Sequence, residues 1–191
     1  MCPDFKSGWL LVPALWLTAC AAAPVSQEVA VVDVQRIPSV ELADLGPAPE
    51  LQNEVWLNTP GPLRLADLRG RVVLLDMWTF GCINCQRVVP YLSEWYDRYR
   101  EQGLVVIGNH YPEFDHERQL GNLQAALEQL EIEYPVAQDN DRRTWGAYRT
   151  RFWPTLYLID KRGHLRYSHI GEGRYAETEA AIQTLLAEVH P

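Results

Sequence analysis

The sequence predicts an α/β domain in which helices flank a central mixed sheet. Residues 72–78 and 104–108 are near-continuous apolar runs, typical of strands buried on both faces. Between them, apolar residues at helical spacing indicate a long helix over about 84–102, so the two strands should pair in parallel through a crossover. Strands on either side of the turn at 161–163 should pair antiparallel, which makes the sheet mixed.

The segment ahead of the first buried strand is expected to form a β-hairpin. Residues 54–57 and 63–65 are short apolar stretches, and the Asn-Thr-Pro-Gly-Pro between them is a turn sequence. A short turn of helix should follow at 66–69. The folded domain is expected to span 46–191.

The remaining elements follow from the same periodicities. The helix over 84–102 should end at Gly103 and kink at Pro90, which has no backbone N–H to donate. After the second buried strand the pattern predicts, in order, a helix over 115–131, a strand over 134–137, a short helix over 142–148, strands over 154–160 and 164–170, and a closing helix over 175–189.

Two cysteines, Cys82 and Cys85, follow the first buried strand and open the long helix. The helix dipole and the unpaired N–H groups at that end favour a thiolate. This spacing places both sulfurs on one face, with Cys82 outward to attack and Cys85 behind it to resolve a mixed disulfide. The pair predicts thiol–disulfide exchange, with its own disulfide in place of a cofactor.

A Cys-x-x-Cys pair is also half of many zinc sites. The other cysteines, Cys2 and Cys20, lie near the N-terminus, and no His-x-x-x-His partner follows. His110 and His116 flank Glu113, but five scattered histidines without a ligand triad are more often surface residues. We therefore predict no metal site.

Asp76 is a carboxylate in the middle of the first apolar strand. An unpaired charge there is costly, so its pKa should be raised. The structural alternative is that neighbouring hydrogen-bond donors satisfy Asp76.

The chain has 191 residues, enough for one domain plus a tail, and a formal net charge of −8. This negative net charge provides no basic surface for nucleic acid, so nucleic acids are excluded as partners.

Residues 1–19 are expected to be a signal peptide. Lys6 supplies its positive charge, and the apolar stretch at 9–19, broken by Pro13, falls short of the roughly 20 residues of a membrane span. Residues 20–45 lack periodicity and should form a flexible tether.

Leu-Thr-Ala-Cys at 17–20 resembles the lipobox of bacterial lipoproteins. This resemblance implies that Cys20 is lipidated and that Cys2 is removed when the signal peptide is cleaved. It also implies that the domain is attached to the cell envelope and faces the periplasm or the exterior. The alternatives are a plain signal peptide cleaved after Ala19 or within 21–23, and a retained anchor helix. Outside the cytoplasm, the cysteine pair must exchange electrons with a membrane or exported partner.

The order of elements, with Cys-x-x-Cys opening the first long helix, resembles the thioredoxin fold. Trp-Thr-Phe-Gly-Cys-Ile-Asn-Cys at 78–85 is similar to the core motif of the exported group that includes the TlpA, ResA and DipZ C-terminal domains. Ala-Pro at 48–49 with residues 65–70 matches the N-terminal addition of that group, and 113–137 fits its helix–strand insertion. The resemblance spans 47–189.

Trp153-Pro154-Thr155 matches the cis-proline loop of the family. The resemblance implies that Pro154 is cis beside the disulfide and offers main-chain groups to a substrate peptide. The alternative is that Pro154 merely starts an edge strand. Trp78, Phe80 and Trp153 would form an apolar rim for docking a partner, or else be plain core aromatics.

The resemblance also implies roles for two acids. In thioredoxins an acid at the position of Asp76 helps to move the proton of the buried cysteine, so Asp76 is the candidate general base and acid for Cys85. Glu113 resembles an acid that some TlpA-like proteins place near the active site, although an exposed loop position would explain it equally.

The predicted function is disulfide exchange with partner proteins, leaning toward the reductase direction. A first alternative is a thiol peroxidase of the peroxiredoxin type, whose motif is Pro-x-x-x-Thr-x-x-Cys. Thr79 fits that motif, but Leu75 stands where the proline should be. A second alternative is a non-enzymatic copper carrier that binds the metal through the cysteine pair and a histidine such as His110. Copper carriers of this fold, however, prefer a longer spacer between their two cysteines.

Overall fold

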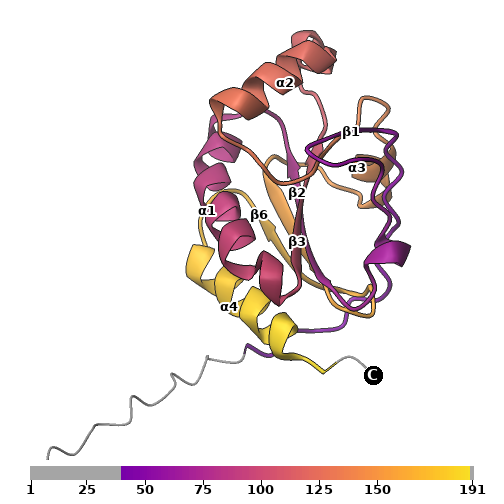
Figure 1. Ribbon diagram of the computed structural model, residues 1–191, viewed down its shortest axis with the longest axis vertical. Helices are drawn as coiled ribbons and strands as arrows, with labels where there is room; N and C mark the ends of the chain where they lie inside the picture. Colours follow the sequence, from indigo (N-terminus) through magenta and orange to yellow (C-terminus); the bar gives the residue numbers. More distant parts are fainter. Residues whose placement is uncertain (1–39, 190–191) are drawn as a thin grey trace, which may run out of the picture. The chain divides into compact units, whose positions relative to one another are not determined.

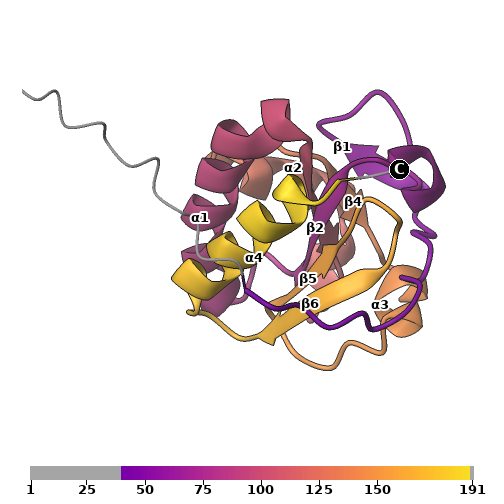
Figure 2. The same cartoon turned by 90° about the horizontal axis from the view of Figure 1, so that it is seen from below.

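Six strands form one mixed sheet in the order β1-β4-β3-β2-β5-β6, shown in Figures 1 and 2. The computed structural model describes residues 40–189, so the predicted signal peptide, Cys20 and most of the predicted tether lie outside the described residues. The strands are β1 Val55–Leu57, β2 Val72–Trp78, β3 Leu104–His110, β4 Val136–Gln138, β5 Thr155–Ile159 and β6 Leu165–Ile170.

Helices cover both faces of this sheet. On one face α1 and α4 lie side by side, and α3 lies on the other (Figures 1 and 2). The helices are α1 Ile83–Tyr99, α2 Leu120–Gln129, α3 Arg143–Ala147 and α4 Tyr175–Ala187, with 3-10 turns at Leu65–Leu68, Arg100–Gln102 and Asp115–Arg118. Among the described residues, we find no helix with the length and apolar character needed to cross a bilayer.

The central strand β2 is buried throughout, as its apolar run predicts. Its alternate residues serve two cores because successive strand side chains point to opposite faces. Val72, Leu74 and Trp78 pack in the cluster that contains Cys85 and the α1 and α4 side chains. Val73, Leu75 and Met77 join the cluster around Trp145 and Tyr148, next to α3. Asp76 therefore belongs to the α1 face.

The predicted pairings of the central strands are confirmed. β2 pairs in parallel with β3, and β5 pairs antiparallel with both β2 and β6. The long helix ends at Tyr99, and a 3-10 turn leads to Gly103, whose φ of +105° suits glycine. The helix expected over 115–131 is interrupted at Gln119, which separates a 3-10 turn from α2.

The prediction of an N-terminal β-hairpin is wrong. β1 instead pairs antiparallel with β4, about 80 residues further along the chain. Asn58, with φ +57°, donates its side-chain amide to the carbonyls of Ile132 (2.7 Å) and Tyr134 (3.2 Å), which holds β1 against that segment. The backbone N–H of Leu65 is bound by the Glu50 carboxylate at 2.6 Å, so this residue starts a 3-10 turn instead of a strand.

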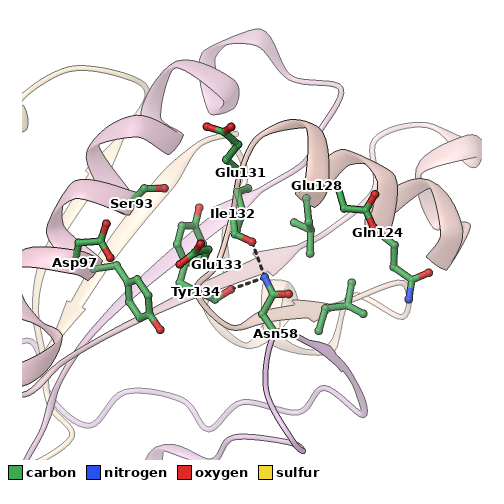
Figure 3. A pocket seen from close by; sticks show the side chains of 12 residues that line it. Asn58, Ser93, Asp97, Gln124, Glu128, Glu131, Ile132, Glu133 and Tyr134 are labelled. Atoms are coloured by element: carbon green, nitrogen blue, oxygen red, sulfur yellow. Dashed lines mark hydrogen bonds between the residues drawn. The ribbon is translucent and has the colours of Figure 1, made fainter.

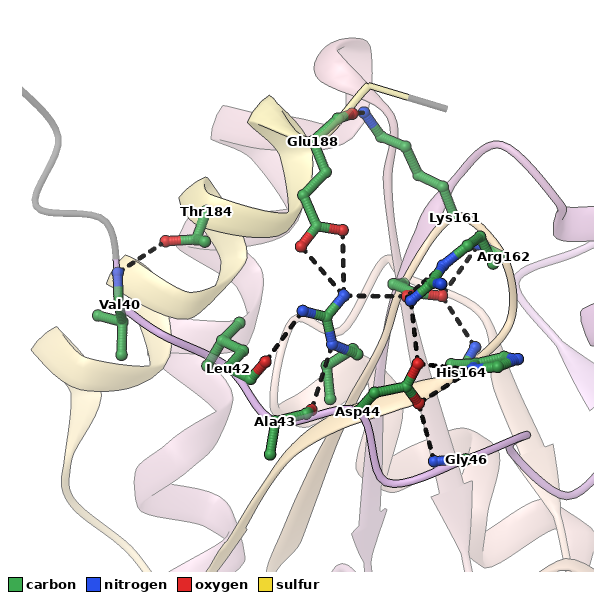
Figure 4. Close-up of polar contacts among 12 residues, drawn as sticks. Val40, Leu42, Ala43, Asp44, Gly46, Lys161, Arg162, His164, Thr184 and Glu188 are labelled. Atoms are coloured by element: carbon green, nitrogen blue, oxygen red, sulfur yellow. Dashed lines mark hydrogen bonds and ion pairs between the residues drawn. The ribbon is translucent and has the colours of Figure 1, made fainter. Parts of the chain in front are cut away.

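The described chain is already packed six residues before the predicted domain start, at Val40, whose N–H donates to Thr184 in α4 at 3.2 Å (Figure 4). Arg166 in β6 donates to the carbonyls of Leu42 (3.0 Å) and Ala43 (3.2 Å). Residues 40–45 are thus part of the fold, which corrects the C-terminal end of the predicted tether.

An ion-pair network stabilises this attachment. Arg166 lies 3.1 Å from the buried Asp160 and 3.0 Å from Glu188. Burial alone would raise the pKa of Asp160, but the backbone N–H of His164 and the guanidinium groups of Arg162 and Arg166 hold it below its usual value. Asp160 therefore remains ionised as the centre of the network.

Candidate active site

Cys82 is the N-cap of α1, with extended backbone angles (φ −85°, ψ 114°), and its sulfur accepts the N–H of Cys85 at 3.4 Å. Both residues are free thiols, Cys82 partly exposed and Cys85 buried. Burial raises the pKa of Cys85, and the nearby Asp76 carboxylate and the Cys82 sulfur raise it further. Only Cys82 is therefore presented to another molecule, and Cys85 needs a base to become a nucleophile.

Asp76 is fully buried, and within residues 40–189 neither of its carboxylate oxygens has a hydrogen-bond partner. The alternative of a satisfied structural carboxylate therefore does not hold. Burial raises the pKa of Asp76 from its ordinary 3.8 to about 8. A carboxyl group with that pKa, coupled electrostatically to Cys85, can accept and return a proton near neutral pH.

The loop before β5 contains the cis peptide Trp153-Pro154. The Trp153 indole is half-buried, donates to the carbonyl of Tyr111 at 3.1 Å, and packs against the cluster that holds Cys85. Thr155 is buried, and its hydroxyl donates to the carbonyl of Phe152 at 2.7 Å. The Thr155 side chain is therefore unavailable to a substrate, and the predicted substrate contact at Thr155 is left to its main chain.

The prediction that Trp78 belongs to an exposed rim is also wrong, because its side chain is completely buried. The indole lies over Gly108 in β3, where an added Cβ would come within 2.8 Å of Nε1. Phe80 is half-exposed and stacks on His110, with ring centroids 5.3 Å apart.

The sequence prediction missed three of the exposed apolar side chains among the described residues, all of them in loops or helix ends that belong to the site. Ile83 is 57% exposed, Phe114 54% and Phe152 57%. Ile83 lies between the two cysteines, and Phe152 precedes the cis-proline loop. The apolar residue between the two cysteines was the sequence signal that could have indicated exposed apolar side chains at the site.

The acid under the active-site loop is Glu117, which the sequence analysis missed. Its buried carboxylate accepts the backbone N–H of Gly81 through Oε1 at 2.9 Å, and those of Glu113 (2.6 Å) and Phe114 (2.9 Å) through Oε2. Burial alone would raise the pKa of Glu117, but these N–H groups and the Thr79 hydroxyl hold it below its usual value. The Glu113 side chain is exposed, and Glu113 contributes its backbone N–H instead.

Gly81 makes the close approach of Glu117 possible, because a Cβ at residue 81 would collide with Oε1. We expect Gly81→Ala to cost about 1–3 kcal/mol of unfolding free energy and to slow the reaction of Cys82, which is the next residue. Urea unfolding and the alkylation rate of Cys82 measure both effects. Gly121→Ala in α2, where a Cβ meets nothing within 4 Å, is the control and should leave Cys82 unchanged. Unchanged stability and reactivity in Gly81→Ala would contradict the tight fit.

The histidines suggested as ligands lie among hydrogen-bonding and aromatic neighbours. His110 is buried, its Nε2 lies 3.2 Å from the Thr79 hydroxyl, and burial lowers its pKa to about 4. His116 stacks on Phe114 with ring centroids 6.0 Å apart. Within residues 40–189, no group of three or more His, Cys, Asp or Glu side chains is placed to hold a metal ion.

The mixed sheet, the cis-proline loop and the cysteine pair at the start of α1 define a thioredoxin-like protein with a dithiol site. Residues 43–168 match the AhpC/TSA family, and the chain belongs to this family.

Similar proteins include curated relatives and solved structures. Protein DipZ of Mycobacterium tuberculosis is 46% identical over 156 residues, which are 80% of this chain and 22% of DipZ. The thiol–disulfide oxidoreductase ResA of Bacillus cereus is 30% identical over 123 residues, 64% of this chain and 68% of ResA. A crystal structure of a thioredoxin-like superfamily protein shares 34% identity with a TM-score of 0.71, covering 76% of this chain and 99% of that one. The chain thus spans about a fifth of the length of DipZ.

Proposed function

We propose that this protein is a thiol–disulfide oxidoreductase that exchanges disulfides with partner proteins. The observation that carries the proposal is the arrangement of three groups. Cys82 is presented at the start of α1, Cys85 is buried behind it, and the buried Asp76 has no hydrogen-bond partner among the described residues. The relatives named as thiol–disulfide oxidoreductases support the same activity.

In the reducing direction the chemistry has two steps. The Cys82 thiolate attacks a disulfide of the partner, forming a mixed disulfide and expelling one partner thiolate, which takes up a proton. Asp76 then accepts the proton of Cys85, and the Cys85 thiolate attacks the Cys82 sulfur and expels the second partner thiolate, which also takes up a proton. The partner gains two electrons and two protons, and the protein is left with the Cys82–Cys85 disulfide.

The surroundings of the pair favour the reductant direction. Strong oxidants of this chemistry have a stabilised reduced form. Here Ile83 and Asn84 carry no charge that would stabilise a thiolate, and burial together with Asp76 disfavours the Cys85 thiolate. The reduced pair therefore lacks these sources of the thiolate stabilisation that is typical of strong oxidants.

The partner is proposed to dock beside Cys82. Ile83, Phe114 and Phe152 present exposed apolar area, and Phe80 and Trp153 are half-exposed. An apolar side chain flanking the partner's cysteine suits this surface. We further propose that the domain works outside the cytoplasm and is attached to the bacterial envelope by a lipid on Cys20, which rests on the leader sequence alone.

The activity is tested by mixing the reduced protein with a disulfide-bonded protein and following thiol release by mass spectrometry. We expect exchange, with a reduction potential nearer to about −270 mV than to the roughly −120 mV of strong oxidants. A value near the latter would overturn the reductant direction, and absence of exchange would overturn the function. Peroxide consumption with a thiol donor, or stoichiometric high-affinity Cu(I) binding, would favour the peroxidase or the copper carrier instead.

A further inference from the structure

The Glu117 carboxylate is buried without a cation beside it. Its side chain is completely buried, and no ion pair of the described residues includes it. The neighbouring Arg118 lies 3.6 Å from Asp115 instead. Buried charges are costly and are usually paired, so the role of this one must lie in the groups that it holds together.

The two oxygens of this carboxylate bind two different segments of the chain. Oε2 accepts the backbone N–H groups of Glu113 at 2.6 Å and Phe114 at 2.9 Å, on its own turn. Oε1 accepts the N–H of Gly81 at 2.9 Å, 36 positions earlier and directly before Cys82. A carboxylate accepts through both oxygens, whereas an amide places a donor in one of the two positions. A glutamine at residue 117 would therefore lose its bond to one of the segments.

The turn that Glu117 fixes carries exposed aromatic side chains. Phe114 is 54% exposed and stacks on the exposed His116, with ring centroids 6.0 Å apart. His116 in turn lies edge-on to Phe80, at 5.8 Å between the ring centroids, and Phe80 directly precedes Gly81. A row of rings thus runs from the cysteine loop to Phe114, parallel to the backbone tie through Glu117.

The segment between β3 and β4, which contains this turn, is separated from α1 by a cavity along part of its length. Gln124 and Glu128 of α2 line this cavity of about 870 Å³ together with Ser93 and Asp97 of α1 (Figure 3). Asn58 anchors the end of the segment that follows α2, through two backbone carbonyls. The end next to the cysteines depends on its own ties, and the carboxylate is the one that reaches the cysteine loop.

We propose that Glu117 is a positioning residue, which fixes Phe114 relative to the Cys82 sulfur for the recognition of partner proteins. An apolar side chain beside the partner's reactive cysteine would lie on Phe114 while the partner's sulfur meets Cys82. Both contacts can be made together only if the two groups keep one geometry, because a docking residue at a variable distance does not orient the reacting atoms. The proposal rests on the proposed exchange activity and adds the residue that makes the exchange selective.

The test compares two disulfide-linked peptide dimers as oxidants of the reduced full-length chain. The peptides are identical except for phenylalanine or serine next to the cysteine. We expect the second-order rate constant to be roughly fivefold higher for the phenylalanine peptide, as one added aromatic contact allows. Glu117→Gln should lower this preference to less than about twofold, since the amide can keep the N–H groups of Glu113 and Phe114 but not that of Gly81.

Glu50→Gln is the matched control for the loss of a carboxylate. Glu50 also accepts three backbone N–H groups, those of Leu51, Leu65 and Ala66. Leu51 and Leu65 pack in the cluster on the opposite face of the sheet from Cys85. This substitution should lower the free energy of unfolding in urea and keep the preference for the phenylalanine peptide. Loss of the preference in Glu50→Gln as well would assign the effect to general destabilisation and overturn the role of Glu117.

A second variant keeps the test informative if Glu117→Gln does not fold. Phe114→Ser changes an exposed side chain, and it should lose the same preference. In the double variant the two losses should not add, because they remove one contact. A preference retained in Phe114→Ser, or in folded Glu117→Gln, would overturn the proposal, as would equal rates of the wild-type protein with both peptides. A wild-type protein that reduces neither peptide would overturn the exchange activity itself, so the two failures are distinguishable.

Discussion

Cys82→Ser is expected to abolish disulfide exchange, and Cys85→Ser to accumulate covalent complexes with partner proteins. Cys82 is the partly exposed thiol at the start of α1, whereas Cys85 is buried and cannot meet a partner directly. Without Cys85, the mixed disulfide on Cys82 has no resolving thiol. Thiol release by mass spectrometry and non-reducing gels of whole-cell protein measure the two outcomes.

The double variant lacking both thiols is the control for any contribution from Cys2 and Cys20. It should form no complexes and show no exchange. An active Cys82→Ser protein would rule out the assignment of the attacking sulfur. Complexes trapped by Cys82→Ser instead of Cys85→Ser would reverse the two roles.

Asp76→Asn is expected to stabilise the protein increasingly as pH rises. In the unfolded chain Asp76 ionises at its ordinary pKa of 3.8, whereas burial raises the pKa to about 8 in the folded protein. Between these values the unfolded chain has lost a proton that the folded protein still holds, so the free energy of unfolding falls with rising pH. A difference of about four pH units corresponds to roughly 5 kcal/mol. Asn, which does not ionise, removes this loss.

Urea unfolding of both proteins at pH 5 and pH 9 tests this expectation. Asp160→Asn is a control of opposite sign, because the folded protein holds the pKa of Asp160 below its usual value. That substitution should destabilise the protein at neutral pH, with a smaller effect in acid. If Asp76→Asn changed stability equally at both pH values, Asp76 would not be the buried titrating acid. The same variant should also slow exchange near neutral pH, since Cys85 loses its base.

The accuracy of sequence prediction here depended on whether local or distant contacts decide the structure. β2 was predicted with its observed bounds because burial on both faces leaves a continuous apolar run. The prediction of a hairpin was wrong because Asn-Thr-Pro-Gly-Pro is a strong local turn signal, whereas the strand that pairs with β1 is β4, which is distant in the sequence.

The same distinction applies to the site. Cys82 and Cys85 were identified because the two-residue spacing between them is what allows the two thiols to form a disulfide. Asp76 was identified because a charged residue interrupts an apolar strand. The role of Glu117 depends on its approach to Gly81, 36 positions earlier, which no local pattern encodes. The burial of Trp78 depends likewise on the absence of a side chain at Gly108 in the neighbouring strand.

The hydrogen bond between Leu45 and Leu165 places the upstream attachment at the far end of the sheet from the reactive sulfur. Leu165 is aligned with Ile159, and Ile159 with Val73 at the beginning of β2, whereas Cys82 follows the other end of that strand. Seven strand residues, or roughly 20 Å, separate the two ends. A chain held from its N-terminal side would therefore point its dithiol away from the point of anchorage, and a bulky partner could reach the sulfur without meeting the surface that holds the protein.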